Sequence, residues 1–340
     1  MSKTSGLVEE ILFCRSVFTE EERGYNAEKE RPGDTYMNNF RLYILLVMIM
    51  FAWGMNVPAM KYLTSQMGPV TMTSLRIFLA GVTVFAILAV FKMIRKPAKR
   101  EWPLVMVAAA LNVVAHHYLI SIGISLTSGT NSGLIIGTSP IMTAVFSLLL
   151  LKLSPSKWQW LGFVLGFAGV TATVLAGNAE TSAGSVGDLY ILLAIVAQVL
   201  SFMVISKASE TLDPRLLTAY MFVFGSIGIF FISLLQEPGE WRRFAEMEPK
   251  FWAILVGSGI IATALGHMLY NHAIGEVGPS KAAIFINLNT FFALLGSAWF
   301  LGETITYHHM VGFVVIALGV LFGSGTAEEL WRMRIRSAKR

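Results

Sequence analysis

The chain has 340 residues, of which 55% are hydrophobic and only 14% are charged. Soluble globular domains carry about 25% charged residues, so this composition excludes an ordinary soluble enzyme and favours a chain embedded in lipid. The net charge of +5 does not indicate a nucleic-acid partner, because the basic residues gather in short loops between apolar segments, as in membrane proteins.

Residues 1–39 precede the first apolar segment and are predicted to form a cytoplasmic tail. The tail lacks the continuous apolar core and small-residue cleavage site of a secretory signal. Residues 7–13 are predicted to form a short amphipathic helix at the membrane surface. The tail also holds the chain's one cysteine, Cys14, so an intramolecular disulfide and a cysteine-based metal cluster are both excluded.

Ten apolar stretches follow, each of about 20 residues, which is the helix length that crosses about 30 Å of hydrocarbon. Spanning segments of this kind must be helical, because lipid offers the backbone no hydrogen-bond partners. The predicted spans are 42–63, 70–91, 102–125, 131–151, 158–177, 188–206, 215–235, 251–274, 281–301 and 307–324.

The loops after even-numbered spans and the two tails hold 21 of the 26 lysines and arginines. The opposite loops hold only Arg242, Arg243 and Lys250, beside several glutamates. The positive-inside rule then places both termini in the cytoplasm and predicts a multi-pass protein of the cell (plasma) membrane.

Residues 116–170 align without a gap on residues 266–320, at a constant offset of 150 residues, so that His117 matches His267. Each half contains five predicted spans, an odd number, so the second half enters the membrane upside down. The predicted fold is an all-α polytopic membrane protein, with ten transmembrane helices arranged as two inverted five-helix repeats. The repeats cover 40–177 and 188–325, and 326–340 is a basic cytoplasmic tail.

Four short motifs lie in or beside the spans: Trp53-Gly54-Met55-Asn56, Leu75-Arg76-Ile77-Phe78, Gly278-Pro279-Ser280-Lys281-Ala282-Ala283 and Phe300-Leu301-Gly302-Glu303-Thr304-Ile305-Thr306. These motifs resemble those of the drug/metabolite transporter superfamily, in particular its ten-span EamA-domain family. The resemblance covers roughly residues 40–325, and departs from the family's pattern at 151–153, where a Gly-Glu pair is missing, and at Thr290, where proline is common. It implies secondary transport, often efflux, through a central cavity, with spans five and ten peripheral.

Residues 1–36 fall outside this resemblance. Met37-Asn38-Asn39-Phe40-Arg41 has the character of an ordinary cytoplasmic start in such proteins. Two interpretations remain open. The first 36 residues form a disordered native tail, or translation of the native protein starts at Met37 and these residues are not part of it.

All 21 acidic residues fall in tails, loops or span ends, so histidine is the deep group that titrates near neutral pH. His117 and His267 occupy equivalent places in the two halves and are predicted to contact substrate or accept protons in the cavity. The alternative is that they join helices through hydrogen bonds. Arg76 is predicted either to bind a substrate carboxylate or to extend to the interface.

Further polar residues and prolines within spans complete the predicted site. Proline removes a helix hydrogen bond and can open a kink, so Pro58 and Pro140 are candidate hinges or tolerated irregularities. Asn287 and Asn289 are two residues apart, so one of them is expected to line the cavity. The remaining candidate cavity residues are Trp53, Asn56, Asn112, Ser139, Tyr220, Tyr270 and Asn271.

The predicted function is a secondary transporter that exports small metabolites, such as amino acids or related amphipathic compounds, by alternating access. We expect no cofactor, metal or catalytic residue, because motifs for nucleotide binding and hydrolysis are absent from the sequence. The expected partners are a small-molecule substrate and the lipid bilayer. The alternatives are an uptake permease, an intramembrane enzyme using His117, His267 or Tyr270, and a non-transporting membrane receptor.

Overall fold

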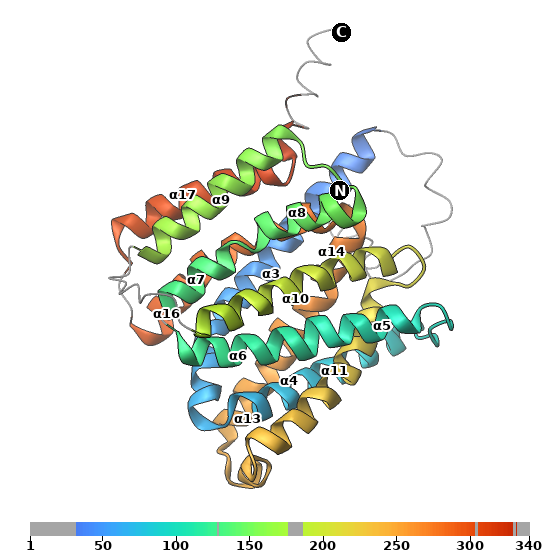
Figure 1. Cartoon of the computed structure of the whole chain (residues 1–340), viewed down its shortest axis with the longest axis vertical. Coiled ribbons are helices and arrows are strands. Elements are labelled where there is room, and N and C mark those ends of the chain that lie inside the picture. The colour runs from blue at the N-terminus through green and yellow to red at the C-terminus, as the bar shows by residue number, and fades with distance from the viewer. Residues whose placement is uncertain (1–31, 128, 176–185, 303–304, 329–330, 332–340) are drawn as a thin grey trace, which may run out of the picture.

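The computed structural model describes residues 32–127, 129–175, 186–302, 305–328 and 331, so the predicted surface helix at 7–13 lies outside the described residues. Every regular element in the described residues is a helix. Nine helices in this part of the chain are long and apolar enough to cross a membrane, and a tenth apolar helix, Tyr307–Gly323, is shorter. The helices pack into one bundle, shown in Figure 1.

The first half of the chain supplies five helical segments, two of which are not uniform α-helices. The first begins at Pro32, before the predicted position 42. The third contains a π-helix, and the fourth is broken at Thr138. The elements are α3 (Pro32–Gln66), α4 (Pro69–Val90), α5 (Trp102–Ala108), η1 (Ala109–Ala115), α6 (His116–Leu126), α7 (Gly129–Gly137), α8 (Ser139–Leu151) and α9 (Lys157–Leu175).

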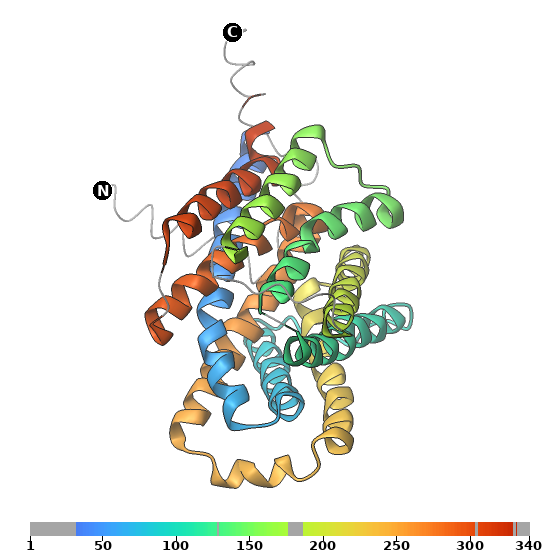
Figure 2. The same cartoon turned by 60° about the vertical axis from the view of Figure 1, so that its left-hand side comes forward.

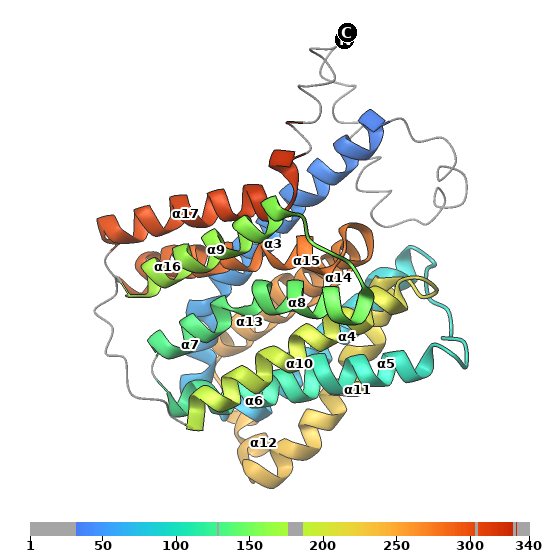
Figure 3. The same cartoon turned by 45° about the horizontal axis from the view of Figure 1, so that its top comes forward.

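The second half follows the same order, with a π-helix in its third segment and a break at 284–285 in its fourth. A short helix, α12, lies in the connection after α11 and is visible at the lower edge of Figure 3. The elements are α10 (Val186–Ala208), α11 (Pro214–Gln236), α12 (Glu240–Arg243), η2 (Phe244–Glu246), α13 (Pro249–Gly257), η3 (Ser258–Leu265), α14 (Gly266–Val277), α15 (Pro279–Ala283), α16 (Ile286–Leu301) and α17 (Tyr307–Gly323).

Helix starts follow from the local sequence. A proline occupies the first or second position of α4, α5, α8, α11, α13 and α15. The missing N–H of proline costs nothing there, because the first helical N–H groups have no partner within the helix. At α17 the start is a capping box, in which Thr306 N donates to His309 Nδ1 at 3.0 Å.

Glycines bring α9 and α17 into direct backbone contact along one side of the bundle, as Figures 1 and 2 show. A Cβ at Gly162 would meet the backbone of Gly323 and Gly319, and a Cβ at Gly312 would meet the backbone of Gly169 and the side chain of Thr173. The two helices therefore run antiparallel. Under the offset of 150 residues, Gly162 matches Gly312 and Gly169 matches Gly319, so the contact is reciprocal.

Helices α4 and α11 also pack against each other and run antiparallel. Glu237, just after α11, accepts hydrogen bonds from Val70 N at 3.0 Å and Thr71 N at 2.8 Å, in the first turn of α4. Carboxylates at a helix N-terminus satisfy free N–H groups and complement the helix dipole. Glu240 adds a bond from Gly68 N at 2.9 Å. One end of this contact between the two halves is therefore closed by second-half carboxylates.

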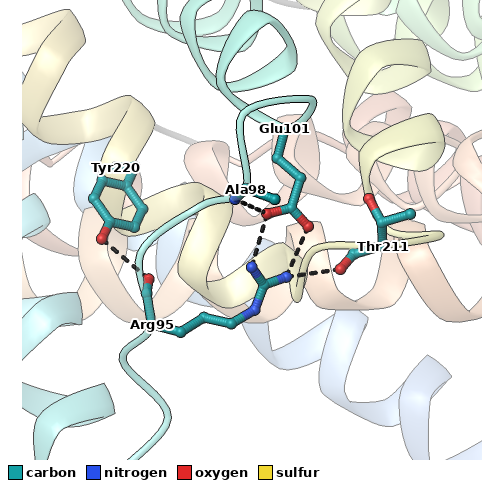
Figure 4. A network of polar contacts seen from close by, with 5 residues as sticks. All are labelled: Arg95, Ala98, Glu101, Thr211 and Tyr220. Carbon is teal, nitrogen blue, oxygen red and sulfur yellow. Dashed lines mark hydrogen bonds and ion pairs between the residues drawn. The ribbon is translucent and has the colours of Figure 1, made fainter.

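The other end of the α4–α11 contact is closed by a loop of the first half. Arg95 donates to Glu101 Oε2 and Oε1 at 2.7 and 2.8 Å and to the Thr211 carbonyl oxygen, just before α11, at 2.7 Å. Ala98 N donates to Glu101 at 2.6 Å, and Tyr220 on α11 donates to the Arg95 carbonyl at 3.1 Å. Figure 4 shows this network, which we call the Arg95 seam.

Candidate functional site

The rings of His117, on α6, and His267, on α14, lie with centroids 6.3 Å apart. These are the residues that match in the internal repeat. Both side chains are partly buried in the bundle. The structure therefore brings the two predicted histidines together at the contact between the halves. With the residues around them, they form what we call the central cluster: Trp53, Arg76, His117, Thr263, His267 and Tyr270.

Trp53 connects α3 to the second half of the chain within this cluster. Its indole ring lies 4.7 Å from the His267 ring and 5.2 Å from the Tyr270 ring, centroid to centroid. Its Nε1 donates to the Ala262 carbonyl, in the π-helix η3, at 2.7 Å. A Cβ at Gly266 would lie 2.5 Å from the same Nε1. The indole can approach because position 266 has no side chain.

The hydrogen bonds of His267 define its orientation and tautomer. Its Nδ1 donates to the Thr263 carbonyl at 3.1 Å. Because a carbonyl oxygen only accepts, the proton sits on Nδ1, and Nε2 of the neutral ring is left as an acceptor. Phe222 on α11 packs edge-on at 5.4 Å between ring centroids. Backbone and aromatic neighbours thus position the imidazole.

Arg76 enters the cluster from α4 and is 7% exposed. Its Nη1 donates to Thr263 Oγ1 at 2.7 Å, while its Nε is buried without a hydrogen-bond partner. The guanidinium is close enough to act electrostatically on both His117 and His267. Arg76 therefore points into the bundle and does not extend to the interface.

Several polar atoms of the central cluster and its neighbours are buried without a partner: Arg76 Nε, His117 Nε2, the Tyr270 hydroxyl and Asn271 Oδ1. Such a group costs about 1–3 kcal/mol when it is buried unpaired. Native proteins rarely leave several of them together. Their concentration here is typical of a site that receives water or a polar solute.

Asn112 and His116, one turn apart on the third segment, belong to a separate network that joins it to α10. Asn112 Nδ2 donates to Ser201 Oγ at 2.8 Å. His116 Nδ1 donates to the Ala194 carbonyl at 3.0 Å, and its Nε2 accepts from Gln198 Nε2 at 3.2 Å. His116 is 5.0 Å from His117 between ring centroids. These bonds hold the helix that carries His117.

The remaining predicted cavity residues lie away from the two histidines or make no contact with them that the structure records. Tyr220 belongs to the Arg95 seam. Asn287 is buried with both amide atoms unpaired, against Gly166 of α9, and Asn289 Oδ1 and Ser139 Oγ are also buried and unpaired. Asn56 lies one turn after Trp53 and is partly buried. Asn271 Nδ2 donates to Thr218 Oγ1 at 2.9 Å.

The two predicted hinges differ in their surroundings. Pro140 opens α8 directly after the break at Thr138, so the fourth segment is interrupted where the sequence places this proline. Pro58 lies inside α3, which continues helical through it. Among the described residues, no group of three or more His, Cys, Asp or Glu side chains is arranged to hold a metal ion.

The site predicted from the sequence did not include Thr263. It also missed the Ala262 carbonyl, Phe222 and Gly266. These contacts depend on the π-helix, in which hydrogen bonds run from i to i+5. The hydrophobic pattern of the sequence does not reveal a π-helix. The two π-helices occupy almost equivalent positions, 109–115 and 258–265, directly before the two histidine positions.

Comparison with known proteins supports one assignment. The chain is 26% identical over 293 residues to the uncharacterized transporter YyaM of Bacillus subtilis (strain 168), covering 85% of this chain and 95% of the relative. It is 25% identical over 286 residues to YvbV, an uncharacterized transporter of the same organism, covering 82% and 90%. A solved crystal structure matches with a TM-score of 0.69 at 15% identity, covering 84% of this chain and 98% of that one, which shows a shared fold.

The family model of the EamA-like transporter family matches residues 41–175 and again residues 185–324. The predicted family resemblance is thereby confirmed, and the long apolar helices agree with it. The chain belongs to the EamA-like transporter family and is a multi-pass membrane transporter.

Proposed function

We propose that this protein is a secondary transporter of the plasma membrane that exports a small metabolite by alternating access, without a cofactor, and that the central cluster is its substrate site. One observation carries the proposal: His117 and His267, equivalent in the repeat, meet at 6.3 Å between ring centroids. Unpaired buried polar atoms surround them. A site between two repeats is where transporters of inverted architecture bind solute.

The proposal includes ten membrane spans in two inverted five-helix repeats, 40–177 and 188–325, with both termini in the cytoplasm. Three observations support it. Helices α4 and α11, the second segments of each half, run antiparallel, and so do α9 and α17, the fifth segments. The glycine contacts between α9 and α17 are reciprocal under the offset of 150 residues. The shorter α17 packs against α9, which supports a role for α17 as the tenth span.

Alternating access requires the two halves to separate at one membrane face while they stay joined at the other. The α4–α11 contact has a polar closure at each end: Glu237 and Glu240 on the α4 N-terminus, and the Arg95 seam at the opposite end. The basic-loop pattern predicts that the Arg95 seam is cytoplasmic. Opening of either closure would expose the central cluster to one side of the membrane.

The direct test is solute flux in liposomes that contain only the purified protein and no nucleotide. We expect saturable, solute-specific counterflow in the wild type and a strong loss of it in the His117→Ala/His267→Ala double variant. The matched control is His308→Ala, because His308 is exposed at the start of α17. Product formation by detergent-solubilised protein, without flux, would support an intramembrane enzyme instead.

Export direction is tested in cells. A strain that overproduces the protein is challenged with amino acids, toxic analogues and amphipathic compounds. Resistance specific to one compound, lost in the double histidine variant, is the expected result. Increased sensitivity to that compound would instead identify an uptake permease.

A further inference from the structure

Two arginines are buried in this bundle, and their surroundings differ. Arg215, at the start of α11, is 1% exposed and donates from Nε to Asp213 at 2.9 and 3.1 Å, with a further ion-pair contact through Nη2. Arg76 is 7% exposed, but its one hydrogen-bond partner in the structure is the neutral hydroxyl of Thr263. A buried charge is costly unless an opposite charge accompanies it. Arg76 therefore lacks the counter-charge that Arg215 has.

The described acidic residues do not supply this counter-charge. Ion pairs within the described part of the chain include Arg95 with Glu101, Lys207 with Glu210, Arg215 with Asp213 and Arg243 with Glu240, and none of these includes Arg76. Arg76 interacts electrostatically with the imidazoles of His117 and His267. Neither imidazole brings a negative charge to the guanidinium.

The unpaired polar atoms of the central cluster favour a negatively charged solute. Arg76 Nε–H and the Tyr270 hydroxyl are buried donors without an acceptor, and His117 Nε2 is a third donor when it carries the ring proton. The unpaired acceptor Asn271 Oδ1, on the helix that carries His267, has no formal charge. An ammonium group would meet the Arg76 charge here without a carboxylate to compensate.

The walls of the site are aromatic. The Trp53 ring lies tilted against those of His267 and Tyr270, at 4.7 and 5.2 Å between centroids. Phe222 lies 5.4 Å from His267, and Phe202 lies 5.6 Å from Tyr270. Aromatic side chains contribute large apolar contact area with a defined geometry. Rings of this kind favour a solute with a flat apolar body.

We infer that the central cluster binds an organic anion, with one carboxylate or similar oxyanion on Arg76 and an aromatic or apolar body against Trp53 and Tyr270. This inference rests on the proposed function, since it names the substrate class of the same site. A guanidinium pairs with a planar oxyanion through two parallel hydrogen bonds. The site selects against cations and against zwitterions, because their ammonium group meets the Arg76 charge and finds no carboxylate to pair with.

The experiment compares three aromatic probes of different charge: benzenesulfonate, phenylalanine and phenyltrimethylammonium. Benzenesulfonate is permanently charged, so passive leakage through lipid does not obscure its flux. Binding is measured by tryptophan fluorescence of the purified protein in detergent, and flux by counterflow in liposomes. We expect benzenesulfonate to bind and to move, and the other two probes to bind at least about tenfold more weakly.

Variants locate the effect at Arg76. Arg76→Gln is expected to weaken benzenesulfonate binding by at least about tenfold. Arg76→Lys, which keeps the charge but loses the planar donor pair, should fall between Arg76→Gln and the wild type. The matched control is Arg242→Gln, an exposed arginine outside the cluster, which should bind as the wild type does. Thr263→Val is a second variant if Arg76→Gln does not fold, because it removes the hydroxyl that orients the guanidinium.

The outcomes separate this inference from the proposed function. Flux of phenylalanine or phenyltrimethylammonium without binding of benzenesulfonate would overturn the anion inference and leave transport standing. Arg76-dependent binding of benzenesulfonate without flux of any probe would support the anion site and count against transport. Equal binding of benzenesulfonate by the wild type, Arg76→Gln and Thr263→Val would also overturn the inference.

Discussion

Arg95 donates two hydrogen bonds to the carboxylate of Glu101, at 2.7 and 2.8 Å. A third hydrogen bond, to the Thr211 carbonyl at 2.7 Å, connects this ion pair to the second half of the chain. Glu101 is 5% exposed, although it lies in a loop. The ion pair therefore orders the loop before α5 and joins it to the segment that precedes α11.

Loss of the Glu101 carboxylate should destabilise this contact. We expect Glu101→Gln to lower the free energy of unfolding by roughly 1–2 kcal/mol, because charge-assisted hydrogen bonds are lost while Arg95 stays half exposed to solvent. Thermal unfolding in detergent measures the change. The matched control is Glu210→Gln, which removes an exposed pair with Lys207 and should leave Tm nearly unchanged. Equal shifts in the two variants would contradict the assignment.

The same pair predicts a pH dependence with a definite sign. Hydrogen bonds from Arg95 hold the pKa of Glu101 below its usual value of 4.5. A lowered pKa in the folded state means that the stabilisation is present above the unfolded-state pKa and is lost as the pH falls through the folded-state pKa. The difference in Tm between wild type and Glu101→Gln should therefore be constant near neutral pH and shrink on acidification below about pH 4.5. A difference in Tm that grows on acidification would contradict the predicted role of the ionised Glu101 carboxylate.

The close approach of α9 and α17 depends on glycine. We expect Gly162→Ala to lower Tm, because the added Cβ would meet the backbone of Gly323 and force the helices apart, at a cost of about 1–3 kcal/mol. The control is Gly257→Ala at the end of α13, where a Cβ meets nothing within 4 Å. There alanine should be neutral or slightly stabilising, as expected for a helical position. Similar Tm values for the two variants would contradict the packing argument.

The bond from Trp53 to the π-helix is expected to matter for transport. Trp53→Phe keeps an aromatic ring beside His267 but removes the donor to the Ala262 carbonyl. We expect flux to fall roughly two- to tenfold, which corresponds to one lost hydrogen bond. The control is Trp299→Phe, because Trp299 lies on α16 and is 78% exposed. This variant should transport as the wild type does. Unchanged flux in Trp53→Phe would show that this bond does not position the site.

Residue patterns in the chain predict the fold more completely than the site. Apolar stretches locate the helices because crossing lipid demands length and hydrophobicity. The offset of 150 residues pairs His117 with His267 in the sequence itself. The contact of Arg76 with Thr263 is different. It depends on the π-helix η3, whose wider turn changes which residues face α4 and α3. Hydrophobic periodicity does not reveal such a turn.

Helix breaks limited the prediction in the same way. Asn287 follows the break at 284–285 and packs against Gly166 of α9. The predicted ninth span was continuous, so it did not predict this contact. Tyr220 lies on a helix near the middle of the chain, but its hydroxyl bonds the loop at Arg95. Polar residues within apolar spans identify candidates, and tertiary contacts decide which of them meet.

Membrane orientation is accessible to labelling in a Cys14→Ser background. We expect Lys99→Cys and Arg336→Cys to react with a membrane-impermeant maleimide from the cytoplasmic side only, and Arg242→Cys from the opposite side only. This outcome follows from the basic-loop pattern. Labelling of positions 99 and 336 from opposite faces would remove the basis for two inverted repeats.

The central claim, that the two halves separate at the Arg95 seam to admit solute to the central cluster, is tested most directly by cross-linking this seam. Lys96→Cys and Thr211→Cys, both at exposed positions, are combined in the Cys14→Ser background, which leaves Arg95, Glu101 and the residue-211 carbonyl in place. A reducible bifunctional thiol reagent is then applied before counterflow is measured in liposomes. We predict that complete cross-linking abolishes flux and that reduction restores it, while each single cysteine variant is unaffected. Full flux through protein that is completely cross-linked at the seam would contradict alternating access by this route.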